Sequence, residues 1–339
     1  MTRAAAACRL IALLAMPGAA ALAGEGDAGL EWGWLAFGDL YDVPRFHDPQ
    51  GEDATGAVVR RAYLTFDAGL GPGWFARLRF EANQSGEFET YDFEADMKDF
   101  YAGRDFGAHR LLIGLSPTPA FDLIEEAWGL RYLAKTPMDL QGLPSRDTGV
   151  ALRGPLTADG RFAYRVMLGA GDDIGAGGGE GDKLMSAVTW HPAPNWTVDL
   201  FADYEALPGP SDRRTLQAFV AYETDQLRVG LQYSDQDRGH DPPVELVSGY
   251  LVARTGAAAS AILRVDRLLE PSARGEDIDY LPFDPSAEAT MLIAGLEFEH
   301  GTHYRITPNV VAKWYGRDDA GERPETDVHL RLTFFLDFE

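Results

Sequence analysis

Hydrophobic and polar residues alternate along most of this chain, in runs of about ten residues that are separated by turn-forming segments. The run that ends the chain has one apolar side, formed by Val328, Leu330, Leu332, Phe334, Leu336 and Phe338. Its other side carries His329, Arg331, Thr333 and Asp337. A period of two is typical of a β-strand with two different faces. About sixteen such runs follow Gly24, so the sequence predicts an all-β chain.

The connections between these runs alternate between short and long. Short turns are expected at 70–73, 105–108, 155–160, 192–195, 225–226, 255–257 and 300–302, and longer links at 42–57, 85–93, 116–146, 171–182, 205–214, 237–245, 268–288 and 316–326. Short turns at one rim and long loops at the other are typical of outer-membrane barrels. A soluble sandwich of two sheets, which alternation alone leaves open, has no reason to sort its loops in this way. We therefore expect a transmembrane antiparallel β-barrel of about sixteen strands.

Aromatic residues gather near both predicted rims. Near the short-turn rim we expect Trp32, Trp74, Trp190, Trp196, Tyr222, Tyr304 and Phe338, and near the long-loop rim Tyr41, Tyr204, Tyr233 and Trp314. Two aromatic girdles are characteristic of membrane barrels and are not required of a sandwich.

The third long link, Ser116 to Arg146, carries a pattern of its own. Its apolar residues Phe121, Ile124 and Trp128 repeat at helical spacing, after Pro119. Asp122, Glu125 and Glu126 precede Arg131 and Lys135, which is the order that a helix dipole favours. One short helix is predicted here, and a loop of this length is usually functional. The alternative is a helix on the outside of a soluble β domain.

The first 23 residues read as a secretory signal peptide. Arg3 and Arg9 come first, an apolar core runs from Leu10 to Met16, and a small-x-small site ends at Ala23. The mature chain, 24–339, is then a single barrel domain. The only cysteine, Cys8, lies in the leader, which excludes cysteine chemistry from the mature chain.

Net charge excludes one class of partner. The whole chain carries −23, and loss of the leader, with its two arginines and no acidic residue, makes this −25. Such a charge disfavours nucleic acid.

No motif for catalysis or cofactor binding emerges. The glycine-rich stretch 175–183 fails as a Walker motif because Asp182 separates the last glycine from Lys183. His300 and His303 lie close together without a third ligand, so no metal is expected. No G-x-S-x-G occurs, so no catalytic residue is assigned and an outer-membrane hydrolase is the less favoured alternative.

Several motifs resemble one family of Gram-negative outer-membrane porins, the phosphate-selective porin O and P type. They are Val59-Arg60-Arg61-Ala62-Tyr63-Leu64, Met97-Lys98-Asp99-Phe100-Tyr101, Leu112-Ile113-Gly114 leading into Pro117, Arg131-Tyr132-Leu133, Arg146-Asp147-Thr148-Gly149-Val150 and Gly160-Arg161-Phe162-Ala163-Tyr164. The resemblance implies a homotrimer of sixteen-stranded barrels in which the third long loop, 116–146, folds into the lumen as a constriction. The chain departs from the family in ending Phe338-Glu339 and in mixing acidic with basic residues on its inferred lumen faces.

The resulting functional hypothesis is a porin of the outer membrane: a water-filled channel for small hydrophilic solutes and ions, with phosphate as the candidate anion. Lipid and lipopolysaccharide are the expected surroundings, and no cofactor is expected. The pore-lining basic residues by strand parity are Arg61, Arg77, Arg79, Arg165, Arg228, Arg305, Lys313 and Arg331. The constriction loop contributes Asp122, Glu125, Glu126, Arg131 and Lys135. The alternative is a barrel plugged by its loop, acting as an adhesin or structural protein.

Overall fold

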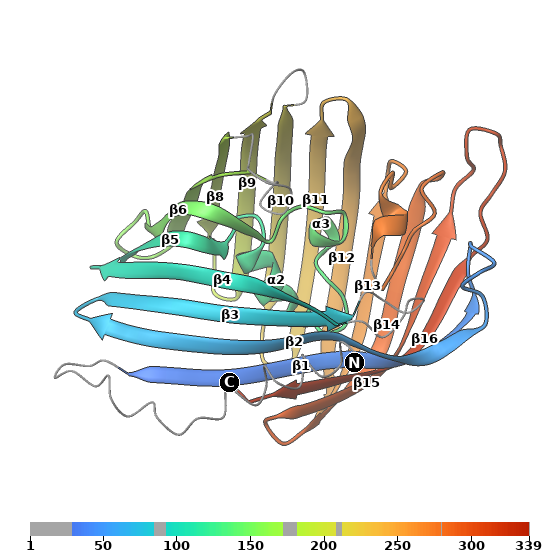
Figure 1. Ribbon diagram of the computed structural model, residues 1–339, viewed down its shortest axis with the longest axis horizontal. Coiled ribbons are helices and arrows are strands. Elements are labelled where there is room, and N and C mark those ends of the chain that lie inside the picture. Colours follow the sequence, from blue (N-terminus) through green and yellow to red (C-terminus); the bar gives the residue numbers. More distant parts are fainter. Residues whose placement is uncertain (1–28, 85–92, 172–181, 208–211, 279, 339) are drawn as a thin grey trace, which may run out of the picture.

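The computed structural model describes residues 29–84, 93–171, 182–207, 212–278 and 280–338. Within them, sixteen strands form one closed antiparallel barrel, in which each strand pairs with its neighbours in sequence and β1 pairs with β16. Figure 1 shows β8–β12 on one side of the barrel, β1–β4 crossing on the other, and two short helices between them. The predicted barrel of about sixteen strands is confirmed.

The strands follow the alternating runs of the sequence. Their bounds are β1 Leu30–Arg45, β2 Ala54–Gly71, β3 Trp74–Gln84, β4 Phe93–Phe106, β5 His109–Pro117, β6 Arg146–Pro155, β7 Phe162–Gly169, β8 Asp182–Trp190, β9 Trp196–Ala206, β10 Arg213–Glu223, β11 Leu227–Arg238, β12 Asp241–Gly256, β13 Ala259–Leu268, β14 Ala289–His300, β15 Tyr304–Tyr315 and β16 Asp327–Asp337. One expected long link is wrong: of residues 237–245, only 239–240 form a turn, and the rest belong to β11 and β12. Gly239 in this turn has a φ of +65°. The strands simply continue beyond the apolar runs that revealed them.

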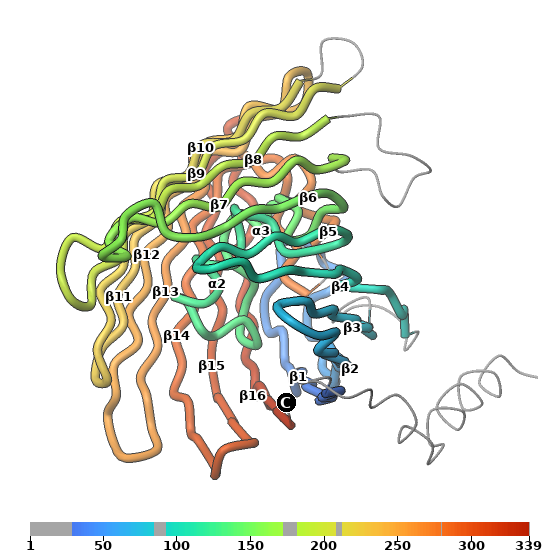
Figure 2. Tube along the Cα trace, turned by 90° about the vertical axis from the view of Figure 1, so that its left-hand side faces the viewer, coloured from blue at the N-terminus to red at the C-terminus, as the bar shows by residue number. Residues whose placement is uncertain are grey.

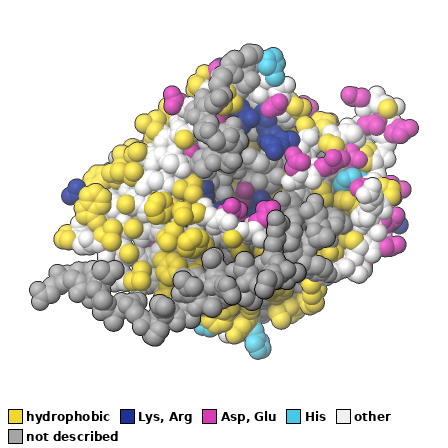
Figure 3. Space-filling view, viewed as in Figure 1, with side chains coloured by type: hydrophobic (Ala, Val, Ile, Leu, Met, Phe, Trp, Pro, Cys, Tyr) yellow, Lys and Arg dark blue, Asp and Glu magenta, His cyan; other side chains and the backbone are white. Residues whose placement is uncertain are grey.

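The outer surface is apolar. Large hydrophobic side chains on alternate strand positions are exposed, among them Phe100 (60%), Leu168 (62%) and Leu216 (58%). In Figure 3 hydrophobic side chains spread over the left and lower parts of the face, while Lys and Arg gather above its centre beside acidic groups. An uncovered apolar surface of this kind marks a face that meets something other than water.

Most of the predicted aromatic residues lie near strand ends. At the short-turn rim Trp32, Trp74, Trp190, Trp196 and Tyr304 are exposed, and at the long-loop rim Tyr204 and Trp314 are exposed. Tyr233 is also exposed, but it lies in the middle of β11 and not at the rim where it was predicted. Phe338 stacks on Trp34, with ring centroids 4.5 Å apart, and its backbone N–H donates to the Trp34 carbonyl. The end of the last described strand is thus fixed to the first.

Two loops fold into the lumen, which is the space inside the barrel. The β5–β6 loop contains α2 (Asp122–Trp128) and α3 (Pro137–Leu140), and the β13–β14 loop contains the 3-10 turn η2 (Gly275–Asp277). In Figure 2 α2 and α3 lie between β13–β14 and β3–β6. The inward third loop is therefore confirmed, whereas the second inward loop was expected only as a long link. No helix in the described ranges is long and apolar enough to cross a membrane.

The helix of the third loop is shorter than its pattern suggested. Gly129 ends α2 with φ +65°, a left-handed conformation that a residue without Cβ adopts at little cost. A Cβ there would also lie 2.0 Å from the Arg228 guanidinium. Arg131 and Lys135 consequently lie beyond the helix, and Pro119 lies before it. The predicted short helix is confirmed as α2, but it ends before the basic residues of the pattern, and α3 follows as a second short helix.

Two β-bulges change which side chains enter the lumen. Along the β1–β2 pairing, Phe37 faces Arg61 but Gly38 faces Val59, so Arg60 is an extra residue. Along β3–β4, Arg79 faces Asp99 but Phe80 faces Met97, so Lys98 is extra. An extra residue interrupts the alternation of the strand. Arg60 with Arg61, and Lys98 with Asp99, therefore both take part in ion pairs inside the barrel.

Deletion of Arg60, combined with Asp39→Asn, is expected to leave the barrel folded. Because Arg60 is extra, its removal preserves every pairing on both sides of it, and Asn avoids an unpaired buried carboxylate at position 39. Unboiled protein should still migrate differently from boiled protein on a denaturing gel. The matched control deletes Thr65, a paired residue of the same strand, which shifts all later positions to the wrong face. If both deletions abolish the difference in migration to the same extent, Arg60 is not an extra residue of the strand.

Candidate functional site

The apolar side of the β5–β6 loop packs against one half of the barrel wall. Ile124 and Trp128 of α2 are 4% and 2% exposed, and the Trp128 ring lies 5.1 Å from that of Tyr250 on β12. The Arg264 guanidinium lies over the other side of the same indole, 5.1 Å from its centroid. The helical spacing that predicted α2 thus serves to fix it to the inner wall of β10–β13. At the level of α2, side chains fill the space between the helix and this part of the wall.

Arginines of the wall hold this loop by its backbone. Arg60 donates to the carbonyl oxygens of Tyr132 and Leu133, and Arg264 donates to that of Lys135 (2.7 Å). From other strands, Arg165 donates to the Pro119 oxygen (3.2 Å) and Arg238 to the Gln141 oxygen (2.6 Å). These donors come from β2, β7, β11 and β13, which only a loop inside the barrel can reach. Charged donors make the stronger hydrogen bonds, so the path of the loop is well fixed.

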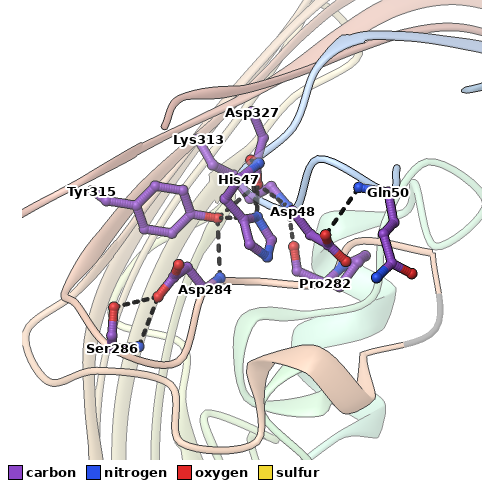
Figure 4. A network of polar contacts seen from close by, with 9 residues as sticks. All are labelled: His47, Asp48, Gln50, Pro282, Asp284, Ser286, Lys313, Tyr315 and Asp327. Atoms are coloured by element: carbon purple, nitrogen blue, oxygen red, sulfur yellow. Dashed lines mark hydrogen bonds and ion pairs between the residues drawn. The ribbon is translucent and has the colours of Figure 1, made fainter. Parts of the chain in front are cut away.

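The β13–β14 loop is held by a buried polar network (Figure 4). Lys313 of β15 is fully buried, forms an ion pair with Asp327 of β16 (2.8 Å) and donates to the Pro282 carbonyl oxygen of the loop. The Asp327 carboxylate also accepts from the Tyr315 hydroxyl (2.6 Å) and contacts His47 Nδ1 (2.9 Å). Three segments, namely the β1–β2 connection, the last two strands and the loop, therefore meet at one carboxylate.

The two inward loops also contact each other. The Lys135 backbone N–H donates to the Tyr280 hydroxyl (3.0 Å), and the Ser272 hydroxyl donates to the Gln141 side chain (2.7 Å). Arg331 of β16 donates to the Tyr280 carbonyl oxygen. A displacement of one loop would thus disturb the other.

Three of the groups of charges that face the lumen near the β5–β6 loop contain unequal numbers of basic and acidic residues. On the wall, Arg61 and Lys98 share Glu81 (3.3 Å each), and Arg79 and Arg146 share Asp99 (3.8 and 2.5 Å). On the loop, Arg131 is shared by Glu125 and Asp139 (2.9 and 3.4 Å). Each wall group carries one surplus positive charge, and the loop group carries one surplus negative charge. Lys98 and Glu125 retain 22% and 26% exposed side chains, so these groups meet water.

The loop carboxylates have shifted pKa values. Burial raises the pKa of Glu125 above its ordinary value, against the opposing effect of Arg131. Burial likewise raises the pKa of Asp122, which Arg165 and Arg153 oppose. Burial would also raise the pKa of Asp139, but Arg131 and Lys135 outweigh it and the pKa is lowered. Glu125 and Asp122 therefore bind protons more readily than ordinary carboxylates do.

The basic residues selected by strand parity have different surroundings. Arg61, Arg79 and Arg165 face the lumen near the β5–β6 loop, and Arg165 pairs with Asp122 (3.3 Å) and Asp199 (2.9 Å). Arg77 instead forms two hydrogen bonds with Asp67 of the neighbouring strand (both 2.7 Å). Its Nε and Nη2 are directed at Asp67 across the strand pairing and not at the loop carboxylates.

Four further basic residues divide into two pairs. Arg228 and Arg305 line a cavity of about 530 Å³ near the short-turn rim. Lys313 and Arg331, 0% and 4% exposed, instead hold the β13–β14 loop and present almost no surface to solvent. Strand parity identified their side of the sheet, but it could not reveal a loop that covers them.

The constriction-loop residues also differ among themselves. Asp122 pairs with wall arginines, and Glu125 and Arg131 form the loop charge group. Glu126 is exposed, and Lys135 lines a cavity of about 600 Å³ on the long-loop side. A third cavity, of about 520 Å³, lies at the short-turn side against Leu123 of α2. The loop thus lies between spaces that open toward opposite rims.

The sequence interpretation missed Arg60, Lys98, Arg238 and Arg264. A signal existed for the first two, because two consecutive charged residues inside an alternating strand indicate a bulge. Among the described residues, no cluster of three or more His, Cys, Asp or Glu could hold a metal ion. The predicted leader, 1–23, and most of the glycine-rich stretch, 175–181, lie outside the described residues.

No protein-family model matches the chain. No curated protein matches it either. Solved structures do. An anion-selective porin from Comamonas acidovorans superimposes with a TM-score of 0.67 at 13% identity, covering 92% of this chain and 100% of that one. OmpF of Salmonella typhi, in complex with daunomycin, gives 0.61 at 10% identity (91% and 97%). A trimer form of OmpT, an outer membrane protein of Vibrio cholerae, gives 0.58 at 8% identity (91% and 99%). At these identities the likeness concerns the fold.

Replacement of Lys313 by Met is expected to lower the free energy of unfolding by about 3–5 kcal/mol, because it removes one partner of a buried ion pair. Urea titration monitored by tryptophan fluorescence measures this loss. Trypsin should also reach the β13–β14 loop before the rest of the barrel.

The matched control for Lys313→Met is Arg274→Ala. Its ion pair with Asp277 lies on the same loop (3.2 Å) but is exposed, at 74% and 67%, and an exposed pair contributes little. A Lys313→Met protein as stable as this control would show that the network does not hold the loop.

Proposed function

We propose that this protein is an outer-membrane porin, a channel through which small hydrophilic solutes and ions diffuse. The observation that carries the proposal is a closed sixteen-stranded barrel whose inward loop is fixed along one half of the wall and faces half-exposed charges on the other. A barrel of sixteen strands is wide enough for an aqueous lumen. The exposed apolar side chains and the terminal aromatic rings fit a lipid surrounding.

The location and the assembly are part of the same proposal. Residues 1–23 would direct export, and the barrel would reside in the outer membrane of a Gram-negative bacterium, against lipid and lipopolysaccharide. A homotrimer is supported by the sequence resemblance and by the trimer form of the Vibrio cholerae protein with this fold.

Anion preference is a finer part of the proposal. The two wall groups of the lumen, around Glu81 and Asp99, contain four basic and two acidic residues. Rings of charge at a constriction set ion preference, and the surplus on this part of the wall is positive although the whole chain carries −23. The Comamonas protein is described as anion-selective. Phosphate is the anion suggested by the resemblance of the sequence motifs.

A barrel plugged by its loops is the second candidate. It is favoured by the second inward loop, whose Tyr280, Leu281 and Phe283 are at most 2% exposed. Ion conductance separates the two candidates, because a plugged barrel passes no current.

Purified protein in a planar bilayer is expected to give stepwise conductance, and two substitutions should shift its reversal potential in opposite directions. Lys98→Met removes the surplus charge of a wall group, so the channel should favour cations more. Glu125→Gln neutralises the loop group, so it should favour anions more. Arg323→Ala, which removes an exposed charge of the β15–β16 connection, is the control and should shift the reversal potential neither way. If both variants conduct and have the reversal potential of the wild type, the charge groups of the lumen do not set ion selectivity.

Acidification is expected to shift the reversal potential toward anions, beginning at a higher pH than ordinary carboxylates require. The folded-state pKa values of Glu125 and Asp122 are raised, so both groups lose their negative charge early as the pH falls. Because the pKa values are higher in the folded state than in the unfolded state, protonation of these two carboxylates stabilises the folded loop. A pH series of reversal potentials measures the shift. In the Glu125→Gln variant, the shift of the reversal potential that protonation of Glu125 causes should be absent. A pH series identical to that of the wild type would show that Glu125 does not cause the shift.

A further inference from the structure

Aromatic rings and guanidinium groups interleave on the inner wall of β2–β5, between the short-turn rim and the lumen charge groups. We call these six residues the aromatic–arginine strip: Tyr63, Phe75, Arg77, Arg79, Tyr101 and Arg110. Arg110 Cζ lies 4.6 Å from the ring centroid of Phe75, and Arg79 Cζ lies 5.4 Å from that of Tyr63. Tyr101 and Arg77 face each other across the β3–β4 pairing. Neither the diffusion of small solutes nor the loop anchors require this arrangement.

The strip is accessible from inside the barrel. Its three rings are half-buried, and the side chains of Arg77 and Arg110 are 32% and 41% exposed. Gly103 makes room for the Phe75 ring, since a Cβ at that position would lie 2.2 Å from it. Phe75 and Tyr101 meet edge to face, with centroids 6.5 Å apart and planes at 89°. A rigid aromatic surface therefore lines this part of the lumen.

Two arginines of the strip retain a donor for a solute. Arg77 uses Nε and Nη2 for Asp67, and Arg110 uses Nε and Nη2 for Asp105. The Nη1 atoms of both have no hydrogen-bond partner among the described residues. Each guanidinium is thus oriented by a carboxylate while one of its nitrogen atoms stays available for another acceptor.

We propose that the aromatic–arginine strip binds small aromatic carboxylates as they pass through the barrel. Guanidinium groups already lie over the rings of Tyr63 and Phe75. The ring of such a solute would therefore pack against Tyr101, and its carboxylate would accept a hydrogen bond from Nη1 of Arg77 or Arg110. An aliphatic carboxylate gains only the second contact, and a neutral aromatic solute gains only the first. The inference rests on the proposed function, because it names a solute class for that channel.

The test compares benzoate with cyclohexanecarboxylate, which has the same charge and a similar size but no aromatic ring, in single-channel recordings. Benzoate should reduce the current saturably, with a half-blocking concentration about two- to tenfold lower than that of cyclohexanecarboxylate, the range expected for one aromatic contact. Benzyl alcohol should block less than benzoate. Equal block by benzoate and cyclohexanecarboxylate, or by benzoate and benzyl alcohol, overturns the proposal.

Substitutions then locate the site. Tyr101→Leu and Arg77→Met should each raise the half-blocking concentration of benzoate, whereas Tyr101→Phe should retain the wild-type value. Arg305→Met is the matched control, because it removes a lumen guanidinium that lies over Phe335 on another part of the wall (4.9 Å). An effect of Arg305→Met as large as that of Arg77→Met would overturn the assignment to the strip. If Tyr101→Leu does not fold, Arg77→Met decides.

Failure of the channel and failure of the strip give different results. A wild-type protein that passes no current contradicts the proposed function, and benzoate binding is then measured by calorimetry on the folded barrel. Binding that Arg77→Met weakens and Arg305→Met does not would support the strip without a channel. A conducting channel with no discrimination among the three probes would retain the function and reject the strip.

Discussion

The pairing of β1 with β16 is the interaction on which everything else in this molecule depends. It runs from Leu35 opposite Asp337 to Arg45 opposite Val328, and it leaves the sheet without a free edge. A closed sheet satisfies its backbone hydrogen bonds internally, which permits an apolar outer surface with no water to bond to. Closure also creates an interior that side chains of the strands alone cannot fill at this strand number. The inward loops occupy part of that interior.

The interior is divided between packing and charge. On the side of β10–β13, α2 buries its apolar residues against the wall as in a soluble protein core. On the side of β2–β5, paired and partly exposed charges remain, together with half-buried rings. The division follows from the two different faces of α2, because an amphipathic helix inside a barrel packs its apolar face against one side of the wall. The residues that present charges and rings to the open part of the lumen therefore differ from the residues that hold α2 in place.

The alternating pattern was sufficient to predict the strands and, with the alternation of loop lengths, the closed barrel, whereas the inward course of the third loop was expected from the resemblance of the sequence motifs. The prediction failed where a β-bulge interrupts the alternation of side chains. Arg60 and Lys98 are extra residues, and parity counted through them assigns one charged residue of each pair to the wrong side. It also failed for the β13–β14 loop, whose residues Tyr280 and Phe283 show no periodicity, and which is held by Lys313 and Arg331 from strands far along the sequence. Such contacts depend on tertiary position, which no window of sequence contains.

The arginine anchors of the β5–β6 loop bind carbonyl oxygens, and every residue type has a carbonyl oxygen. A substitution at any of the four accepting positions would keep the acceptor that the wall arginine uses. These positions and their donors are Leu133 with Arg60, Lys135 with Arg264, Pro119 with Arg165, and Gln141 with Arg238. The wall arginines thus bind the backbone of the loop and do not depend on the identity of its side chains. Mutations in the loop can alter the side chains that it presents to the lumen while the loop keeps its place. During evolution, a barrel built in this way can change the chemistry of its interior while it retains its fold.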